Sequence, residues 1–219
     1  MSSESLITRL AEGLQPVRRL PSPGRQAARW LALAMACAAL AAYGQSMTMA
    51  GRLTLRLGLP MNNWQAGLSL LTGIAAVVAA ACLAHPDRTR RWLFVPLAPL
   101  AAWLGLLGWN WAAEITRVGE AALHPGIDRA CLTTILLVGV PLAAVQYHAL
   151  RHGGAVRPVA VLLLGALASA ALCSAATSLV HPARTASTIL AWHGAAAALL
   201  MLLGLVLGRW LLLAPARAA

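Results

Sequence analysis

Residues 158–180 of the chain, PVAVLLLGALASAALCSAATSLV, form an apolar run without a charged side chain. A helix needs about 20 such residues to cross the hydrocarbon core of a bilayer. The run lacks the two-residue alternation of a strand, and a helix satisfies its own backbone hydrogen bonds inside lipid. The stretch therefore predicts a membrane-spanning helix, with Pro158 in the first turn, where its missing N–H donor is not needed.

Five further apolar runs have similar length, at residues 30–50, 64–84, 92–113, 130–150 and 187–213. The run at 30–50 is the weakest, because Gly44, Gln45, Ser46 and Thr48 dilute its second half. Trp30, Trp64, Trp92 and Trp210 fall near the ends of the runs, where amphipathic rings prefer to lie. Together the runs predict an all-α integral membrane protein with a bundle of six transmembrane helices.

The composition agrees with lipid as the main solvent. Of 219 residues, 60% are hydrophobic and 11% charged, against about 45–50% and about 25% in soluble domains. These values exclude a soluble enzyme, a disordered chain and a disulfide-stapled secreted module.

All 17 basic residues are Arg, and they predict the orientation. With the N-terminus inside, 12 of them fall on the cytoplasmic side and 5 on the outer side. Excess Arg in short cytoplasmic loops is the usual pattern, so we expect both termini in the cytoplasm. The Arg residues form no basic stripe with interleaved aromatic residues, so we expect no direct contact with nucleic acid.

The expected division of the chain is a cytoplasmic segment at 1–29, a transmembrane domain at 30–213 and a cytoplasmic tail at 214–219. In the first segment, Leu6, Ile7, Leu10 and Leu14 make one stripe of a short helix that Pro16 stops. The opposite face carries Glu4, Ser5, Thr8, Arg9 and Glu12, with a formal charge of −1. Membrane-surface helices usually show a basic polar face. A groove on a soluble partner and the lipid surface therefore both remain open as the place where the stripe is buried.

Cysteine and histidine residues are the candidate chemical groups. Cys37, Cys82 and Cys173 fall within spans and are expected to pack as small apolar residues. Cys131 follows Arg129 at the outer end of the fourth span, which allows either a reactive thiol or an inert one. His124, His181 and His193 share that end, but no tight spacing supports a metal site, and we expect no metal and no cofactor.

The predicted spans hold no charged residue at depth, which argues against a transporter. No catalytic motif is present, so we expect no enzyme activity. A haem or redox subunit using His148 or His193, and a small transporter or structural membrane protein, remain the alternative functions. Gly204 and Gly208 form a GxxxG pair, which favours close packing within the bundle and leaves self-association into a homo-oligomer as the alternative.

The chain also resembles a known family. Residues 6–20, LITRLAEGLQPVRRL, resemble the N-terminus of NrsF-type proteins, which are six-span anti-sigma factors of the bacterial inner membrane. Arg90-Arg91-Trp92 before the third span, Cys131 opening the fourth and Trp192-His193-Gly194 opening the sixth are similar to the family as well.

The resemblance implies a regulator of transcription that takes part in a stress response. Its partner would be an extracytoplasmic-function sigma factor, held at the membrane and released on an envelope signal. The contact residues would lie in the N-terminal segment: Leu6, Ile7, Leu10, Leu14, Pro16, Val17, Arg18 and Arg19. Cys131 and His181 would sense the signal. The family often has a second Cys in a His-Cys-Pro sequence, where this chain has Val180-His181-Pro182, so a two-cysteine sensor is not expected.

Overall fold

A computed structural model gives the fold of the chain. It describes residues 3–12, 21–48, 60–124, 126, 129–153, 157–180 and 185–213, without the side chains of some helix residues. Most of the described residues are helical, and the described ranges contain no strand. The elements are α1 (Ser3–Glu12), α2 (Pro23–Thr48), α3 (Pro60–Leu83), the 3-10 turn η1 (Arg90–Phe94), α4 (Leu97–Val118), the 3-10 turn η2 (Gly119–Leu123), α5 (Arg129–Gly153), α6 (Pro158–Val180) and α7 (Ala186–Leu213).

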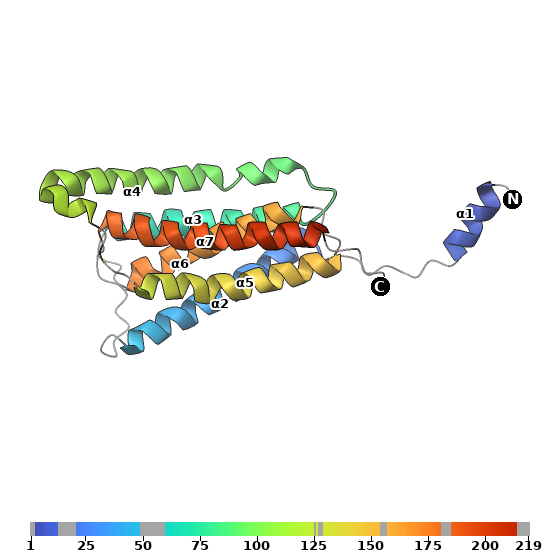
Figure 1. Ribbon diagram of the computed structural model, residues 1–219, viewed down its shortest axis with the longest axis horizontal. Coiled ribbons are helices and arrows are strands. Elements are labelled where there is room, and N and C mark those ends of the chain that lie inside the picture. Colours follow the sequence, from blue (N-terminus) through green and yellow to red (C-terminus); the bar gives the residue numbers. More distant parts are fainter. Residues whose placement is uncertain are drawn as a thin grey trace.

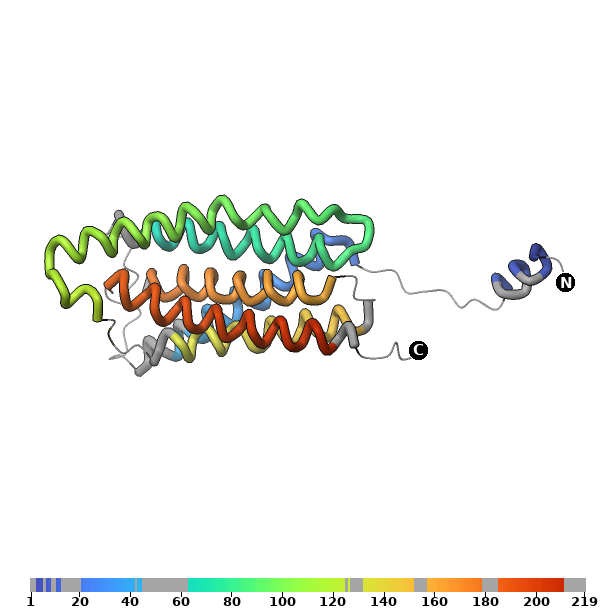
Figure 2. Tube along the Cα trace, turned by 45° about the horizontal axis from the view of Figure 1, so that its top comes forward, coloured from blue at the N-terminus to red at the C-terminus, as the bar shows by residue number. Residues whose placement is uncertain are grey.

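Helices α2 to α7 lie side by side along one long axis and alternate in direction (Figure 1). The starts of α2, α4 and α6 and the ends of α3, α5 and α7 meet at one end of the bundle, which we call end A. The opposite helix ends meet at end B. Helix α1 is drawn apart from the bundle in both views (Figures 1 and 2).

Helix α6 is the centre of the bundle. It packs against α2, α3, α5 and α7, and its most extensive contact is with α3. Ala168, Ala171, Cys173 and Val161 are fully buried in it. By contrast, α4 packs mainly against α3 and α7 among these long helices and leaves Leu104 and Trp109 exposed. In a bilayer, such exposed apolar side chains face lipid.

Five helices are long and apolar enough to cross a membrane: those at 63–83, 90–123, 132–151, 158–178 and 186–210. Helix α2 is not among them, although it has 26 residues and packs against α3, α5 and α6. Arg25, Gln26 and Arg29 lower the hydropathy of its first turns, and Gly44 and Gln45 that of its last turns. The helical membrane class is thus supported, and the sixth span stays a prediction.

The third predicted span differs from the structure. Its first residues form the separate turn η1, and α4 begins at Leu97, because Pro96 cannot continue a helix from the preceding turn. Helix α4 continues past the predicted end at residue 113 to Val118 and therefore contains Glu114 and Arg117. Both charged residues lie in the last turns of the helix, beyond the end of the predicted span.

The GxxxG pair of α7 is used within the chain. A Cβ atom on Gly204 would lie 3.2 Å from the Leu162 carbonyl oxygen, and one on Gly208 would lie 2.8 Å from the Val159 Cα atom. Both glycines therefore face the backbone of α6 and permit its close approach to α7. A dimer formed through this pair would require α6 to separate from α7.

We expect Gly208→Ala to lower the stability of the bundle by about 1–3 kcal/mol, because the new methyl group would displace the α6 backbone. Gly105→Ala on α4 is the matched control, since a Cβ there meets nothing within 4 Å. It should leave stability unchanged or slightly raised. The midpoint of thermal unfolding of the protein purified in detergent measures both, and equal losses in the two variants would contradict this packing.

Candidate functional site: the N-terminal helix and the two ends of the bundle

The N-terminal helix presents an exposed apolar residue. Ile7 on α1 is 64% exposed, and Glu4, Ser5, Thr8 and Glu12 are exposed as well. The Thr8 hydroxyl donates to the Glu4 carbonyl oxygen one turn earlier at 2.9 Å, which satisfies a polar group within the helix. An exposed apolar side chain on an isolated helix has its burial energy still available for a partner or a lipid surface.

The structure places Leu6 and Leu10 on the α1 backbone, so the predicted helix is present, but their side chains lie outside its description. Leu14, Pro16, Val17, Arg18 and Arg19 lie outside the described residues altogether. Of the residues predicted to contact the partner, the structure therefore describes the side chain of Ile7 and the helical backbone of Leu6 and Leu10.

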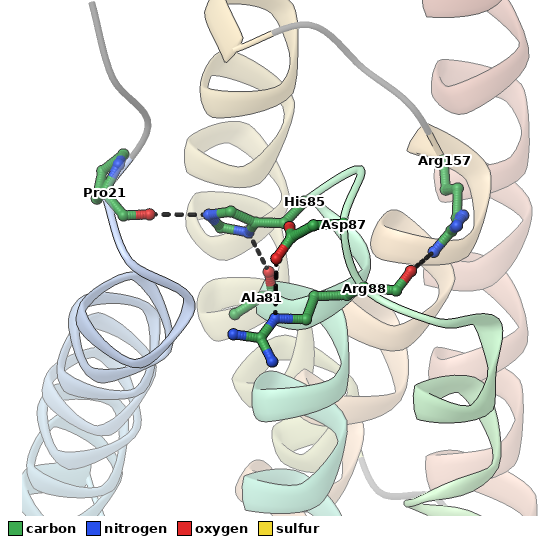
Figure 3. A network of polar contacts seen from close by, with 6 residues as sticks. All are labelled: Pro21, Ala81, His85, Asp87, Arg88 and Arg157. Carbon is green, nitrogen blue, oxygen red and sulfur yellow. Dashed lines mark hydrogen bonds and ion pairs between the residues drawn. The ribbon is translucent and has the colours of Figure 1, made fainter.

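End A carries the next described residues. His85, in the turn after α3, points one ring nitrogen at its own helix and the other at the chain before α2 (Figure 3). Nδ1 lies 2.9 Å from the Ala81 carbonyl oxygen, and Nε2 lies 2.8 Å from the Pro21 carbonyl oxygen. In the same turn, the Arg88 carbonyl oxygen accepts a hydrogen bond of 2.8 Å from Arg157, the residue before α6. These bonds fix the α3–η1 turn to the starts of α2 and α6.

End A is also the basic end. Arg25 and Arg29 of α2, Arg90 and Arg91 of η1, Arg151 of α5 and Arg209 of α7 are exposed there. An ion pair joins Arg88 to Asp87 at 3.4 Å, with both side chains largely exposed. Such a pair contributes little to stability.

End B has a polar network around the start of α7. Thr185 precedes the helix, and its hydroxyl accepts from the Thr188 backbone N–H at 3.3 Å, as an N-cap does. The Thr188 hydroxyl accepts from the Gly126 N–H at 3.0 Å, and Trp192 Nε1 donates to the Gly126 carbonyl oxygen at 2.7 Å. The connection between α4 and α5 is thereby held against α7.

Glu114 joins this network from α4. Its Oε2 atom accepts a hydrogen bond of 2.9 Å from the Ala186 N–H, the first residue of α7. A carboxylate is favourable here, because the N-terminus of a helix carries unpaired N–H groups and a partial positive charge. The sequence analysis missed Glu114, since nothing local in the sequence shows that residue 186 lies beside residue 114.

The residues predicted to sense a signal are placed only in part. Cys131 lies in the first turn of α5, at end B, but its side chain is outside the description, and His181 lies outside the described residues. Cys82 and Cys173 are buried, as predicted, whereas Cys37 is half-buried. The Cys173 thiol lies 3.6 Å from the Thr134 carbonyl oxygen. Within the described ranges, no three His, Cys, Asp or Glu side chains group as metal ligands do.

Comparison with known families gives a match over most of the chain. The family of negative regulators of sigma F, NrsF, matches residues 10–213. The chain belongs to the NrsF family. Comparison with curated proteins and with solved structures found no match.

The family match confirms the resemblance in the sequence, and it names the class of partner. An NrsF-family protein is a negative regulator of a sigma factor. The matched range begins at Leu10, so Leu6 and Ile7 precede it, whereas the other predicted contact residues, Cys131 and His181 lie inside it.

We expect Glu114→Gln to lower stability by about 1 kcal/mol, because a neutral amide accepts the Ala186 N–H more weakly than a carboxylate does. Glu120→Gln is the matched control, since Glu120 is exposed in η2 at the same end. Thermal unfolding of both variants in detergent measures the difference. If Glu114→Gln unfolds at the wild-type temperature, the carboxylate has no role in joining α4 to α7.

Proposed function

We propose that this NrsF-family protein is a membrane-bound anti-sigma factor, which holds an extracytoplasmic-function sigma factor through its N-terminal segment and releases it on an envelope signal. A sigma factor held at the membrane cannot reach core RNA polymerase. The observation that carries the proposal is the family match together with an N-terminal helix whose Ile7 is 64% exposed.

The apolar stripe predicted for the N-terminal segment supports capture of a protein partner. Leu6, Ile7, Leu10 and Leu14 have the sequence spacing of one helix face, and four such side chains would contribute about 1.5–3 kcal/mol each when buried. Ordering one short helix offsets much of this gain. Tight binding therefore needs further contacts, for which Pro16, Val17, Arg18 and Arg19 are the proposed residues.

The positions of the Arg residues support a cytoplasmic N-terminus. The exposed Arg side chains named above gather at end A, where α2 begins and α7 ends. At end B, the described charged side chains are Glu114, Arg117 and Glu120. Arg accumulates on the cytoplasmic side of bacterial membranes. The proposal therefore places end A, the N-terminal segment and the C-terminal tail inside the cell, in the inner membrane.

Helix α2 is proposed as the sixth span. Its 26 residues give a length of about 39 Å, enough for a hydrocarbon core of about 30 Å. Trp30, Ala34 and Ala38 are buried against the bundle, so this helix shares the core of the others. An even number of spans also agrees with both ends of the domain lying at end A.

Release requires a signal that favours a releasing conformation over a holding one, because binding without that preference shifts no equilibrium. We propose end B as the place of detection, with Cys131 and His181 as the sensing residues. At this end, the Glu114 carboxylate accepts a hydrogen bond from the first residue of α7, and Trp192 donates one to the Gly126 carbonyl oxygen. A change there would act on α4, α5 and α7 together. The proposal assigns the protein no catalytic step and no cofactor.

Replacing Leu10 and Leu14 by Asp should abolish capture of the sigma factor, because two charges would have to be buried in an apolar groove. The measurement is co-purification of a small sigma factor with the full-length protein from a bacterial membrane. Ser5→Asp with Thr8→Asp is the matched control, since it adds the same charge to the opposite face of α1. Equal capture by both double variants would reject the stripe as the contact.

A Ser3→Cys variant in a Cys131→Ser background tests the orientation. We expect a membrane-impermeant maleimide to leave the introduced thiol unmodified in cells with an intact inner membrane and to label it after permeabilisation. Labelling in intact cells would place the N-terminal segment outside, and capture of a cytoplasmic sigma factor would then be impossible.

A further inference from the structure

The His85 ring joins two parts of the chain that are 64 residues apart in the sequence. The ring is buried, with 8% of the residue exposed. The His85 backbone N–H bonds the Cys82 carbonyl oxygen instead of the Ala81 carbonyl oxygen, and Nδ1 approaches that Ala81 oxygen. Nε2 reaches Pro21, the residue from which the described chain enters α2 (Figure 3). One side chain therefore caps α3 and holds the start of the bundle.

Both partners of the ring are carbonyl oxygens, which only accept hydrogen bonds, so a ring nitrogen must carry a hydrogen to bond either of them. The Nε2–H group is the donor that the Pro21 carbonyl oxygen requires. The bond to the chain before α2 is therefore made by the end of the ring that lies farthest from the α3 backbone.

Charged groups around the ring come from several elements. Asp87 and Arg88 lie in the same turn, with their side chains paired to each other. Arg157 at the start of α6 bonds the Arg88 carbonyl oxygen, and Arg25 is exposed in the first turns of α2. Arg151, near the end of α5, is exposed at the same end of the bundle. His85 thus lies among the charged side chains of end A.

We propose that His85 is a positioning residue for partner capture: by holding the Pro21 carbonyl oxygen, it fixes the point at which the N-terminal segment leaves the bundle. The inference rests on the proposed function. A fixed exit point limits the orientations of the segment before it binds, so less entropy is lost when the sigma factor is captured.

Tryptic cleavage after Arg25 of the full-length protein in lipid nanodiscs tests the anchor. Arg25 is exposed, but cleavage requires the first turn of α2 to open. Cleavage after Arg209 in the same sample serves as the internal standard. His85→Asn keeps an amide N–H near the position of Nδ1 but is too short to reach the Pro21 carbonyl oxygen. It should raise the ratio of the two rates about fivefold, which corresponds to the loss of one hydrogen bond of about 1 kcal/mol. His124→Asn, the same change at an exposed position of end B, should leave the ratio unchanged.

Rescue by a conservative variant separates an anchor of this kind from a merely structural histidine. His85→Gln places an amide N–H near the position of Nε2, from which it can donate to the Pro21 carbonyl oxygen, so it should keep the wild-type ratio. An equally raised ratio in His85→Gln and His85→Asn overturns the bridge, as does an unchanged ratio in His85→Asn.

Retention of the sigma factor tests the positioning role itself. His85→Asn should retain severalfold less partner than the wild type in the co-purification, while His124→Asn retains the wild-type amount. If His85→Asn retains as much partner as the wild type although its cleavage after Arg25 is faster, the positioning role is overturned. If the wild type retains no sigma factor, the proposed function fails, and the cleavage ratios still decide whether His85 anchors Pro21.

Discussion

The architecture depends on close contact between helix backbones around α6. Lipid is as apolar as a leucine side chain, so helices inside a bilayer associate through packing and hydrogen bonds instead of through exclusion of water. Glycines at the contacts meet this requirement. Gly73 of α3 lies under Leu172, and Gly204 and Gly208 of α7 lie against the α6 backbone at Leu162 and Val159. With α6 held on several sides, the polar connections at the two ends of the bundle have fixed positions.

The two ends differ in the chemistry that they present. End A gathers exposed Arg side chains and holds the His85 bridge to Pro21, just after the proposed partner-binding segment ends in the sequence. End B has a capped helix start, with Glu114 and Thr185 bound to the first residues of α7. This division suits a protein that receives a signal on one side of a membrane and holds a partner on the other. Helices α4 and α7 and the connection before α5 take part in the hydrogen bonds at end B. Helices α4, α5 and α7 then continue along the bundle to end A.

Much of the fold was predictable, because the physical signal is local. Apolar runs of about 20 residues specify spanning helices regardless of what surrounds them, and five of the predicted runs correspond to helices of sufficient length and hydropathy. The boundaries were less predictable. Pro96 divides the third run, and α2 begins at Pro23, well before the apolar run at 30–50. An amphipathic first turn such as that of α2 lowers the mean hydropathy without ending the helix.

The sequence by itself determined the helical membrane class, the apolar stripe of the N-terminal segment and the family, since each depends on neighbouring residues or on their order along the chain. Only the tertiary structure decided that Gly204 and Gly208 face α6 and not another copy, that Glu114 caps α7, and that His85 binds Pro21. Those contacts join residues from different helices. Their existence depends on which helices become neighbours and at what height along the bundle, and no local pattern encodes either of these.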